Sequence, residues 1–171
     1  RHLAWSSVSV AASAIRFFYT QTLKRLDIAM AIPPRRKPQR LPHILSVEEV
    51  ERLLSSPDDP LHRAVLMTVY AAGLRVSEVV RLQLTDLDRD RLMIRVEQGK
   101  RRKDRYTILS PRLLTVLDQY GASRPLTRWL FPARRGEQPM SPRTVRDVFE
   151  TAKTRADVQK PGSIHLLRHY A

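Results

Sequence analysis

The sequence predicts a mainly helical α+β fold with one small three-stranded antiparallel sheet. Two observations support this prediction. Apolar residues recur at helical spacing along most of the chain, whereas three short segments near its middle alternate apolar and polar residues, as strands do. With 42% apolar residues, the 171-residue chain can bury a core, which excludes wholesale disorder.

The chain divides into three regions in this prediction. Residues 1–30 read as one helix, and residues 31–43 form a stiff linker rich in Pro, Arg and Lys. Residues 44–171 hold the sheet and the remaining helices. The apolar stripe of the first helix consists of Val8, Ala11, Ala12, Ile15, Phe18 and Tyr19.

Start and stop signals locate the elements of the third region. A capping box from Ser46 to Glu49 opens one helix, and a second helix over 61–72 ends at Gly73. Ser77 is expected to cap a short third helix. The predicted strands are 84–88, 91–98 and 105–110.

Further helices follow the predicted sheet. Two Ser–Pro pairs open helices, one over 111–121 that Gly121 closes and one over 142–156. A last helix begins near Ser163.

The charge of the chain indicates a polyanionic partner. Lys and Arg number 31 against 17 Asp and Glu, a formal net charge of +14. Nucleic acid is the leading partner class, because each neutralised phosphate releases condensed counterions. The absence of Cys excludes disulfides, thiolate zinc sites and thiol catalysis. No apolar run approaches the ~20 residues of a membrane span and no signal peptide is evident, so we expect a cytoplasmic, nucleoid-associated protein without a membrane partner.

Three segments carry residue types suited to phosphate chemistry. In AAGLRVSE (residues 71–78), Arg75 sits on a tight turn between two helices, where its guanidinium can bind a phosphate bidentately with little loss of entropy. Glu78 can brace it, although such a pair by itself is more often a structural salt bridge than part of a catalytic group. GKRRKDRY (residues 99–106) predicts a basic hairpin tip, either a solvated loop or a device that enters a DNA groove and delivers one Lys to a phosphate.

The third segment is HLLRH, residues 165–169. His165 and Arg168 fall on one helical face, which sets a proton-transfer group beside a fixed cation. His169 follows His165 by four residues, but a third metal ligand is lacking, so no metal is expected.

One acidic pattern competes for a metal assignment. Asp86, Asp88, Asp90 and Glu97 match a calcium-loop template, yet Arg91 occupies the position that needs Gly. We therefore expect a hairpin turn with solvated carboxylates.

Taken in order, GLRVSE, the basic hairpin and HxLRH resemble the tyrosine recombinases, or phage-type integrases. The LFP of 130–132 and the SPRTV of 141–145 fall where that family has similar segments. The resemblance implies the family's catalytic-domain fold over 44–171, without its C-terminal part. It also implies that residues 1–30 are the end of the N-terminal core-binding domain.

The resemblance implies roles for individual residues. Arg75 and Arg168 would bind the non-bridging oxygens of the scissile phosphate, Lys100 would protonate the leaving 5′-hydroxyl, and His165 would assist proton transfer. His169 would be a supporting residue. No cofactor is implied, because the family conserves the bond energy in a 3′-phosphotyrosyl link.

The nucleophilic Tyr of the family follows HxLRH by several tens of residues. The chain given ends at Ala171, and Tyr170 lies too close to Arg168 to match. We therefore expect this chain to lack the nucleophile and to be inactive in DNA cleavage by itself.

The implied partners are double-stranded DNA and other recombinase subunits, in a tetramer on paired sites. Two alternatives are a non-catalytic duplex-DNA-binding remnant or regulator and a basic RNA-binding protein, against which the scarcity of aromatic residues counts. The expected DNA contacts are Arg35, Arg36, Lys37, Arg40, Arg101, Arg102, Lys103, Arg105, Arg143 and Arg146.

Overall fold

The chain forms two compact units, residues 1–42 and 43–171, in a computed structural model. No helix in the described part of the chain is long and apolar enough to cross a membrane. The described residues are 4–32, 44–97, 104–124, 128–134 and 137–170.

The first unit is a helical hairpin. Its elements are α1 (Trp5–Phe17), a π-helical turn (Phe18–Thr22) and α2 (Leu26–Ala31). The prediction of one continuous helix is wrong, because Lys24 adopts a positive φ of 52° and reverses the chain direction. Neither Gly nor Pro marks this turn in the sequence.

The apolar stripe predicted for the first helix is only partly covered in this unit: three of its six residues are exposed and the other three are half-buried. Ile15 and Phe18 are exposed, as are Phe17 and Met30. Ala29 is buried against its neighbours. The unit therefore presents apolar side chains that its own residues do not cover.

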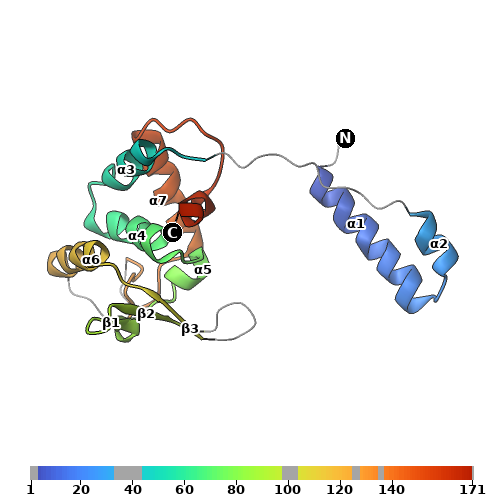
Figure 1. The fold of residues 1–171 in the computed structure, drawn as a ribbon, viewed down its shortest axis with the longest axis horizontal. Coiled ribbons are helices and arrows are strands. Elements are labelled where there is room, and N and C mark those ends of the chain that lie inside the picture. Colours follow the sequence, from blue (N-terminus) through green and yellow to red (C-terminus); the bar gives the residue numbers. More distant parts are fainter. Residues whose placement is uncertain (1–3, 33–43, 98–103, 125–127, 135–136, 171) are drawn as a thin grey trace. The chain divides into compact units, whose positions relative to one another are not determined.

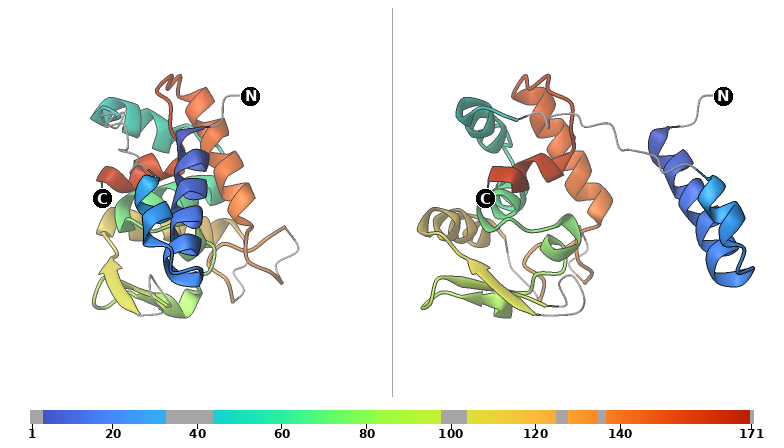
Figure 2. Two further views of the ribbon diagram at one scale, coloured as in Figure 1. Left: turned by 90° about the vertical axis from the view of Figure 1, so that its right-hand side faces the viewer. Right: turned by 45° about the vertical axis from the view of Figure 1, so that its right-hand side comes forward.

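A central helix organises the second unit. This helix, α4 (Pro60–Ala72), contacts every other helix of eight or more residues in the unit, together with β3 and a C-terminal 3₁₀ helix. Figures 1 and 2 show α4 between the sheet at one end of the unit and α3 and α7 at the other. The surrounding elements are α3 (Val47–Ser55), α5 (Val76–Val79), α6 (Pro111–Ser123), α7 (Pro142–Arg155) and η3 (Ile164–Tyr170).

The antiparallel sheet has the predicted three strands in the order β1-β2-β3. They are β1 (Leu87–Asp88), β2 (Met93–Val96) and β3 (Arg105–Ile108), with a short 3₁₀ helix, η2 (Leu84–Asp86), before the first. On β2, Ile94 and Val96 point into the core. Their partners across the ladder are Thr107 and Arg105, so the register turns Arg105 toward the same side.

Most predicted helix boundaries are confirmed. Ser46 and Glu49 form a reciprocal capping box at α3, and Ser141 caps α7 by accepting from the Thr144 backbone N–H. Gly73 ends α4 in the left-handed conformation.

Two details of the predicted helices are wrong. Arg75, not Ser77, occupies the N-cap of α5. Helix α6 runs through Gly121 to Ser123, because the buried ring of Tyr120 holds this end against the core. The last predicted helix is present, begins at Ile164 and is a 3₁₀ helix, η3.

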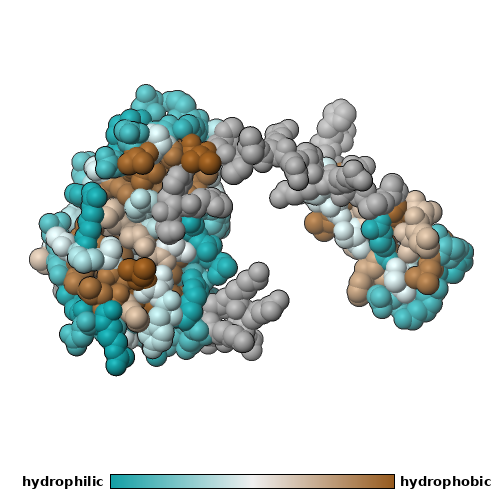
Figure 3. Space-filling model, in the orientation of Figure 1, coloured by the Kyte–Doolittle hydropathy of each residue, from teal (hydrophilic) through white to brown (hydrophobic). Residues whose placement is uncertain are grey.

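In the view of Figure 3 the surface of the second unit combines hydrophilic residues with several apolar patches. The exposed large apolar residues of this unit are Ile44, Val47, Leu92, Met93, Tyr106 and Ile108.

Candidate phosphate-binding site

Arg75 is fixed on the turn between α4 and α5. Gly73 reverses the chain with a φ of 60°, and the side chain of Leu74 is completely buried. The Arg75 backbone N–H donates to Glu78 Oε2 at 2.8 Å, and its Nη1 donates to Glu78 Oε1 at 2.7 Å. The guanidinium is therefore held at its base and at its tip, which lowers the entropy cost of binding an anion.

Glu78 is a buried carboxylate shared by two guanidiniums. Arg105 donates from Nη1 to Oε1 and from Nη2 to Oε2, both at 2.9 Å. Burial by itself raises the pKa of Glu78, but the hydrogen bonds from Arg105 and from Arg75 outweigh it and lower the pKa to about 2. The carboxylate stays ionised, and the cluster keeps one positive charge beyond neutrality.

Arg105 lies on β3 rather than at the displayed tip of the hairpin. Its pairing with Glu78 raises the pKa of the guanidinium, and its side chain is 36% exposed. The strand alternation that faces Thr107 inward also faces Arg105 inward, and this was the sequence signal for its position. The structure thus adds Arg105 to the cluster around Arg75.

Arg168 reaches the same turn from the C-terminal end of the unit. Its Nε donates to the carbonyl oxygen of Gly73 at 2.7 Å. A cavity of about 370 Å³ opens beside it, with Arg105 and Thr107 in its wall. The structure therefore brings Arg75, Arg105 and Arg168 to one place, although they come from three distant segments.

The structure describes some of the other expected site residues but not all of them. His165 is exposed on η3, and because a 3₁₀ helix has three residues per turn, it shares a face with Arg168. Arg143 and Arg146 are exposed on α7. The side chain of His169 lies outside the described residues, as do Lys100, Arg101, Arg102, Lys103, Arg35, Arg36, Lys37 and Arg40.

The acidic turn is solvated only in part: Asp90 and Glu97 are exposed as expected, whereas Asp86 is not. Asp86 is buried, accepts from the Gln83 backbone N–H at 2.9 Å and pairs with Arg95 at 3.2 Å. Asp88 accepts from the Arg91 backbone N–H. Among the described residues, no group of three or more His, Cys, Asp or Glu could hold a metal ion.

Two tyrosines of the second unit have clear environments. Tyr120 is buried, donates to the Leu130 carbonyl oxygen at 3.0 Å, and burial raises its pKa to about 12. Tyr106 is 62% exposed on β3. Tyr120 is therefore a core residue and cannot attack a phosphate.

Comparison with known proteins identifies the family. The model of the phage integrase family matches residues 43–171, the whole of the second unit. The chain belongs to this family of tyrosine recombinases. It is 44% identical to integrase/recombinase y4qK of Sinorhizobium fredii over 170 residues. This alignment covers 99% of the chain and 55% of the relative.

Tyrosine recombinases of other bacteria are also similar. The XerC 2 protein of Ralstonia nicotianae is 39% identical over 144 residues, 77% of this chain and 41% of the relative. The chain thus spans about half the length of these curated relatives.

Solved structures share the fold. The crystal structure of XerA recombinase matches with a TM-score of 0.67 and 26% identity over 98% of this chain and 59% of that one. A lambda integrase dimer bound to a core site matches with a TM-score of 0.76 over 96% of this chain and 64% of that one, at 18% identity. Both structures therefore match the fold of this chain, which is mainly helical with a three-stranded antiparallel sheet.

Proposed function

We propose that the chain is part of a site-specific DNA recombinase or integrase that breaks and rejoins duplex DNA through a 3′-phosphotyrosyl link. One observation carries the proposal. Arg75, Arg105 and Arg168 converge on the α4–α5 turn, where Glu78 and the Gly73 carbonyl hold them in place. Fixed guanidiniums at one point are what a phosphoryl transfer without metal requires.

The arrangement supports a division of roles. Arg75 and Arg168 bind the non-bridging oxygens of the scissile phosphate and stabilise the charge that builds on them in the five-coordinate transition state. Glu78 supports Arg75. Lys100 protonates the leaving 5′-oxygen, and His165 assists proton transfer at the phosphate.

The attacking group is a Tyr hydroxyl, which bonds to phosphorus as the 5′-oxygen leaves. We assign this role to none of the five tyrosines of this chain. Tyr120 is buried, and Tyr170 is too close to Arg168 in the sequence. We therefore propose that residues 1–171 bind DNA but form no covalent adduct by themselves.

Duplex DNA and further recombinase subunits are the proposed partners. Solved structures of the fold include a lambda integrase dimer on a core site and a lambda integrase tetramer on a Holliday junction. In this chain, Arg143 and Arg146 present unburied cations on α7. The basic segments 35–40 and 101–103 supply the other proposed contacts, and a tetramer on paired sites is the proposed assembly.

The test is covalent trapping with the full-length protein. Arg75→Ala and Arg168→Ala should each abolish the protein–DNA adduct on a cognate site, while duplex affinity changes by no more than a few fold. Arg155→Ala, an exposed position on α7 paired with Asp58, is the control and should form the adduct normally. Adducts at the wild-type level in either variant would refute these assignments, and duplex binding without any adduct in the wild type would indicate a non-catalytic regulator.

A further inference from the structure

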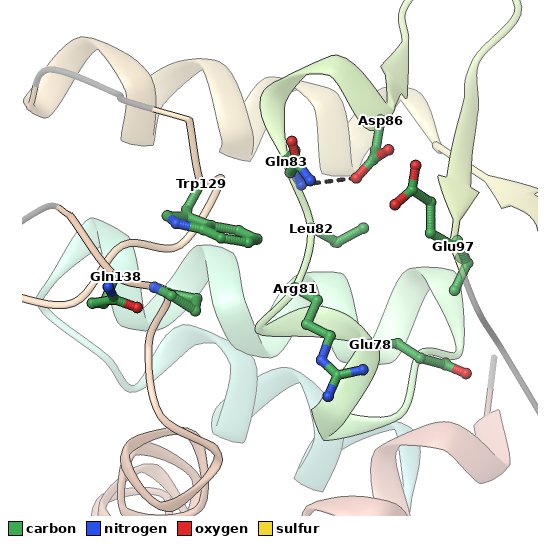
Figure 4. Close-up of a pocket in the computed structure, with 10 residues that line it drawn as sticks. Glu78, Arg81, Leu82, Gln83, Asp86, Glu97, Trp129 and Gln138 are labelled. Carbon is green, nitrogen blue, oxygen red and sulfur yellow. Dashed lines mark hydrogen bonds between the residues drawn. The ribbon is translucent and has the colours of Figure 1, made fainter. Parts of the chain in front are cut away.

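We propose that a second cavity, beside the phosphate-binding cluster, takes a single unstacked nucleobase of the bound DNA. The cavity measures about 320 Å³ and lies between α5, the end of β2 and the segments that carry Trp129 and Gln138 (Figure 4). The proposal rests on the proposed function, because it takes DNA as the partner. Of the residues that line it, only Glu78 has a role assigned above.

Trp129 gives the cavity an aromatic wall that is held in place. Its backbone forms an isolated β-bridge with Gln83, and the next residue, Leu130, donates to the Leu82 carbonyl oxygen at 2.9 Å. The Arg128 guanidinium lies 5.1 Å from the centre of the indole ring. In Figure 4 the indole lies beside Leu82, which lines the same hollow. A fixed indole is a platform on which any base can stack.

Each carboxylate of the cavity already has a guanidinium partner. Asp86 and Glu97 share one arginine, Arg95, at 3.2 and 2.7 Å, whereas Glu78 is shared by two, Arg75 and Arg105. Three carboxylates therefore face three guanidiniums, and the group has no excess negative charge to offer a basic side chain from outside. This argues against a cationic protein segment as the occupant.

The groups that remain available suit a nucleotide. The side chains of Arg81 and Gln138 are exposed and make no hydrogen bond or ion pair with other described residues. The Gln138 amide can donate to and accept from the edge of a base, and the Arg81 guanidinium can bind a phosphate. An indole, an amide and a free cation together match a base with its phosphate.

The position of the cavity connects it with the reaction site. Glu78 lines the cavity and also braces Arg75, so the two sites share one wall. Glu97, another lining residue, directly precedes the segment 98–103 that contains Lys100. A nucleotide next to a phosphate bound at Arg75 is therefore the one this cavity would receive. An unpaired base would enter most readily, because it pays no cost of unpairing.

Trp129 itself reports on the cavity. The chain has two tryptophans, so Trp5→Phe leaves Trp129 as the sole indole. This variant of the full chain is titrated with a duplex carrying one bulged adenine and with the same duplex fully paired. We expect quenching of Trp129 and at least about fivefold tighter binding for the bulged duplex, the lower end of what one stacked base contributes.

Variants separate the cavity from general DNA binding. Gln138→Ala and Trp129→Ala should reduce the preference for the bulged duplex and leave affinity for the paired duplex unchanged. Gln138 is exposed, so its replacement tests the cavity even if Trp129→Ala unfolds the unit. The matched control is Gln119→Ala, exposed on α6 away from the cavity lining, which should keep the full preference.

Each other result would overturn the proposal. Equal affinity for the two duplexes without quenching of Trp129 would remove the base site and leave the proposed function intact. Quenching by an Arg-rich peptide instead of bulged DNA would identify a protein-docking cavity. Failure to bind either duplex would refute the proposed function and this inference with it.

Discussion

At the scale of single residues, the carboxylate of Glu78 determines how two cations of the site are held. Its two oxygens accept from Arg75 and from Arg105, which lies 27 residues away in sequence. Both arginine side chains remain more than a third exposed, whereas that of Glu78 is 7% exposed. The carboxylate is thus a buried support, and the guanidiniums keep surface for a ligand.

The ion pairs of Glu78 predict a pH-dependent contribution to stability. Because its folded pKa of about 2 lies below the ordinary 4.5, this stabilisation is fully present above pH 4.5 and is lost as the pH falls through about 2. Glu78→Gln should lower the free energy of unfolding by on the order of 3 kcal/mol at pH 7 and by less than half of that at pH 3. Urea-induced unfolding at both pH values measures the two differences.

The control for this prediction is Glu51→Gln, an exposed position on α3. It should change the free energy of unfolding by no more than about 0.5 kcal/mol at either pH. If the cost of Glu78→Gln were the same at pH 7 and pH 3, packing rather than charge would explain it.

At the scale of elements, the turn between α4 and α5 is where the site is assembled. Gly73 ends α4, and its carbonyl oxygen receives the Arg168 Nε while Arg75 follows two residues later. The conformation of one residue therefore affects the positions of two cations.

Replacing Gly73 tests this turn. Its φ of 60° costs an L-amino acid about 1–2 kcal/mol, and Asn tolerates the conformation better than Ala. Gly73→Ala should therefore lower the free energy of unfolding by about 1 kcal/mol or more, and Gly73→Asn by less. Urea unfolding of both variants gives the comparison, and an equal or larger loss for Asn would contradict a conformational cause.

Local signals made much of this fold predictable. The reciprocal box of Ser46 and Glu49, the stop at Gly73 and the alternation of β2 each depend on residues within a few positions of one another. The turn at Lys24 gave no signal, because no residue that favours a positive φ stands there. Such a turn depends on contacts between the helices that it joins.

The sequence predicted which residues form the candidate site better than it predicted which residues they contact. The turn between two helices placed Arg75 beside Glu78, and the structure shows that pair. The partner of Arg168 lies 95 residues away, and Arg105 reaches Glu78 from another strand, so neither contact follows from local spacing. Only the packing of η3 and β3 against α4 brings these segments together.

At the scale of the whole molecule, the net charge of +14 is distributed unevenly between paired and free cations. On α7, Arg155 pairs with Asp58 at 2.7 Å, whereas Arg143 is 91% exposed and its nearest carboxylate, on Asp147, is 3.9 Å away. Phosphates compete with the existing partner in the first case and meet an almost free guanidinium in the second. Two cations of one helix therefore differ in how readily they can bind a phosphate, Arg143 without losing a close partner and Arg155 only by giving up its ion pair with Asp58.

This difference predicts how duplex affinity responds to salt. The logarithm of the binding constant should fall linearly with the logarithm of salt concentration, with a slope of about −0.9 for each phosphate contacted. Arg143→Gln should make the slope shallower by about one, because one contact is lost, whereas Arg155→Gln should leave it unchanged.

Fluorescence anisotropy of a labelled duplex between 50 and 200 mM salt measures both slopes, with a single-stranded RNA of equal length as the competing ligand. Equal slopes for the two variants would mean that α7 does not lie on the DNA, and tighter binding of the RNA would favour an RNA-binding protein, since the duplex geometry would then contribute nothing.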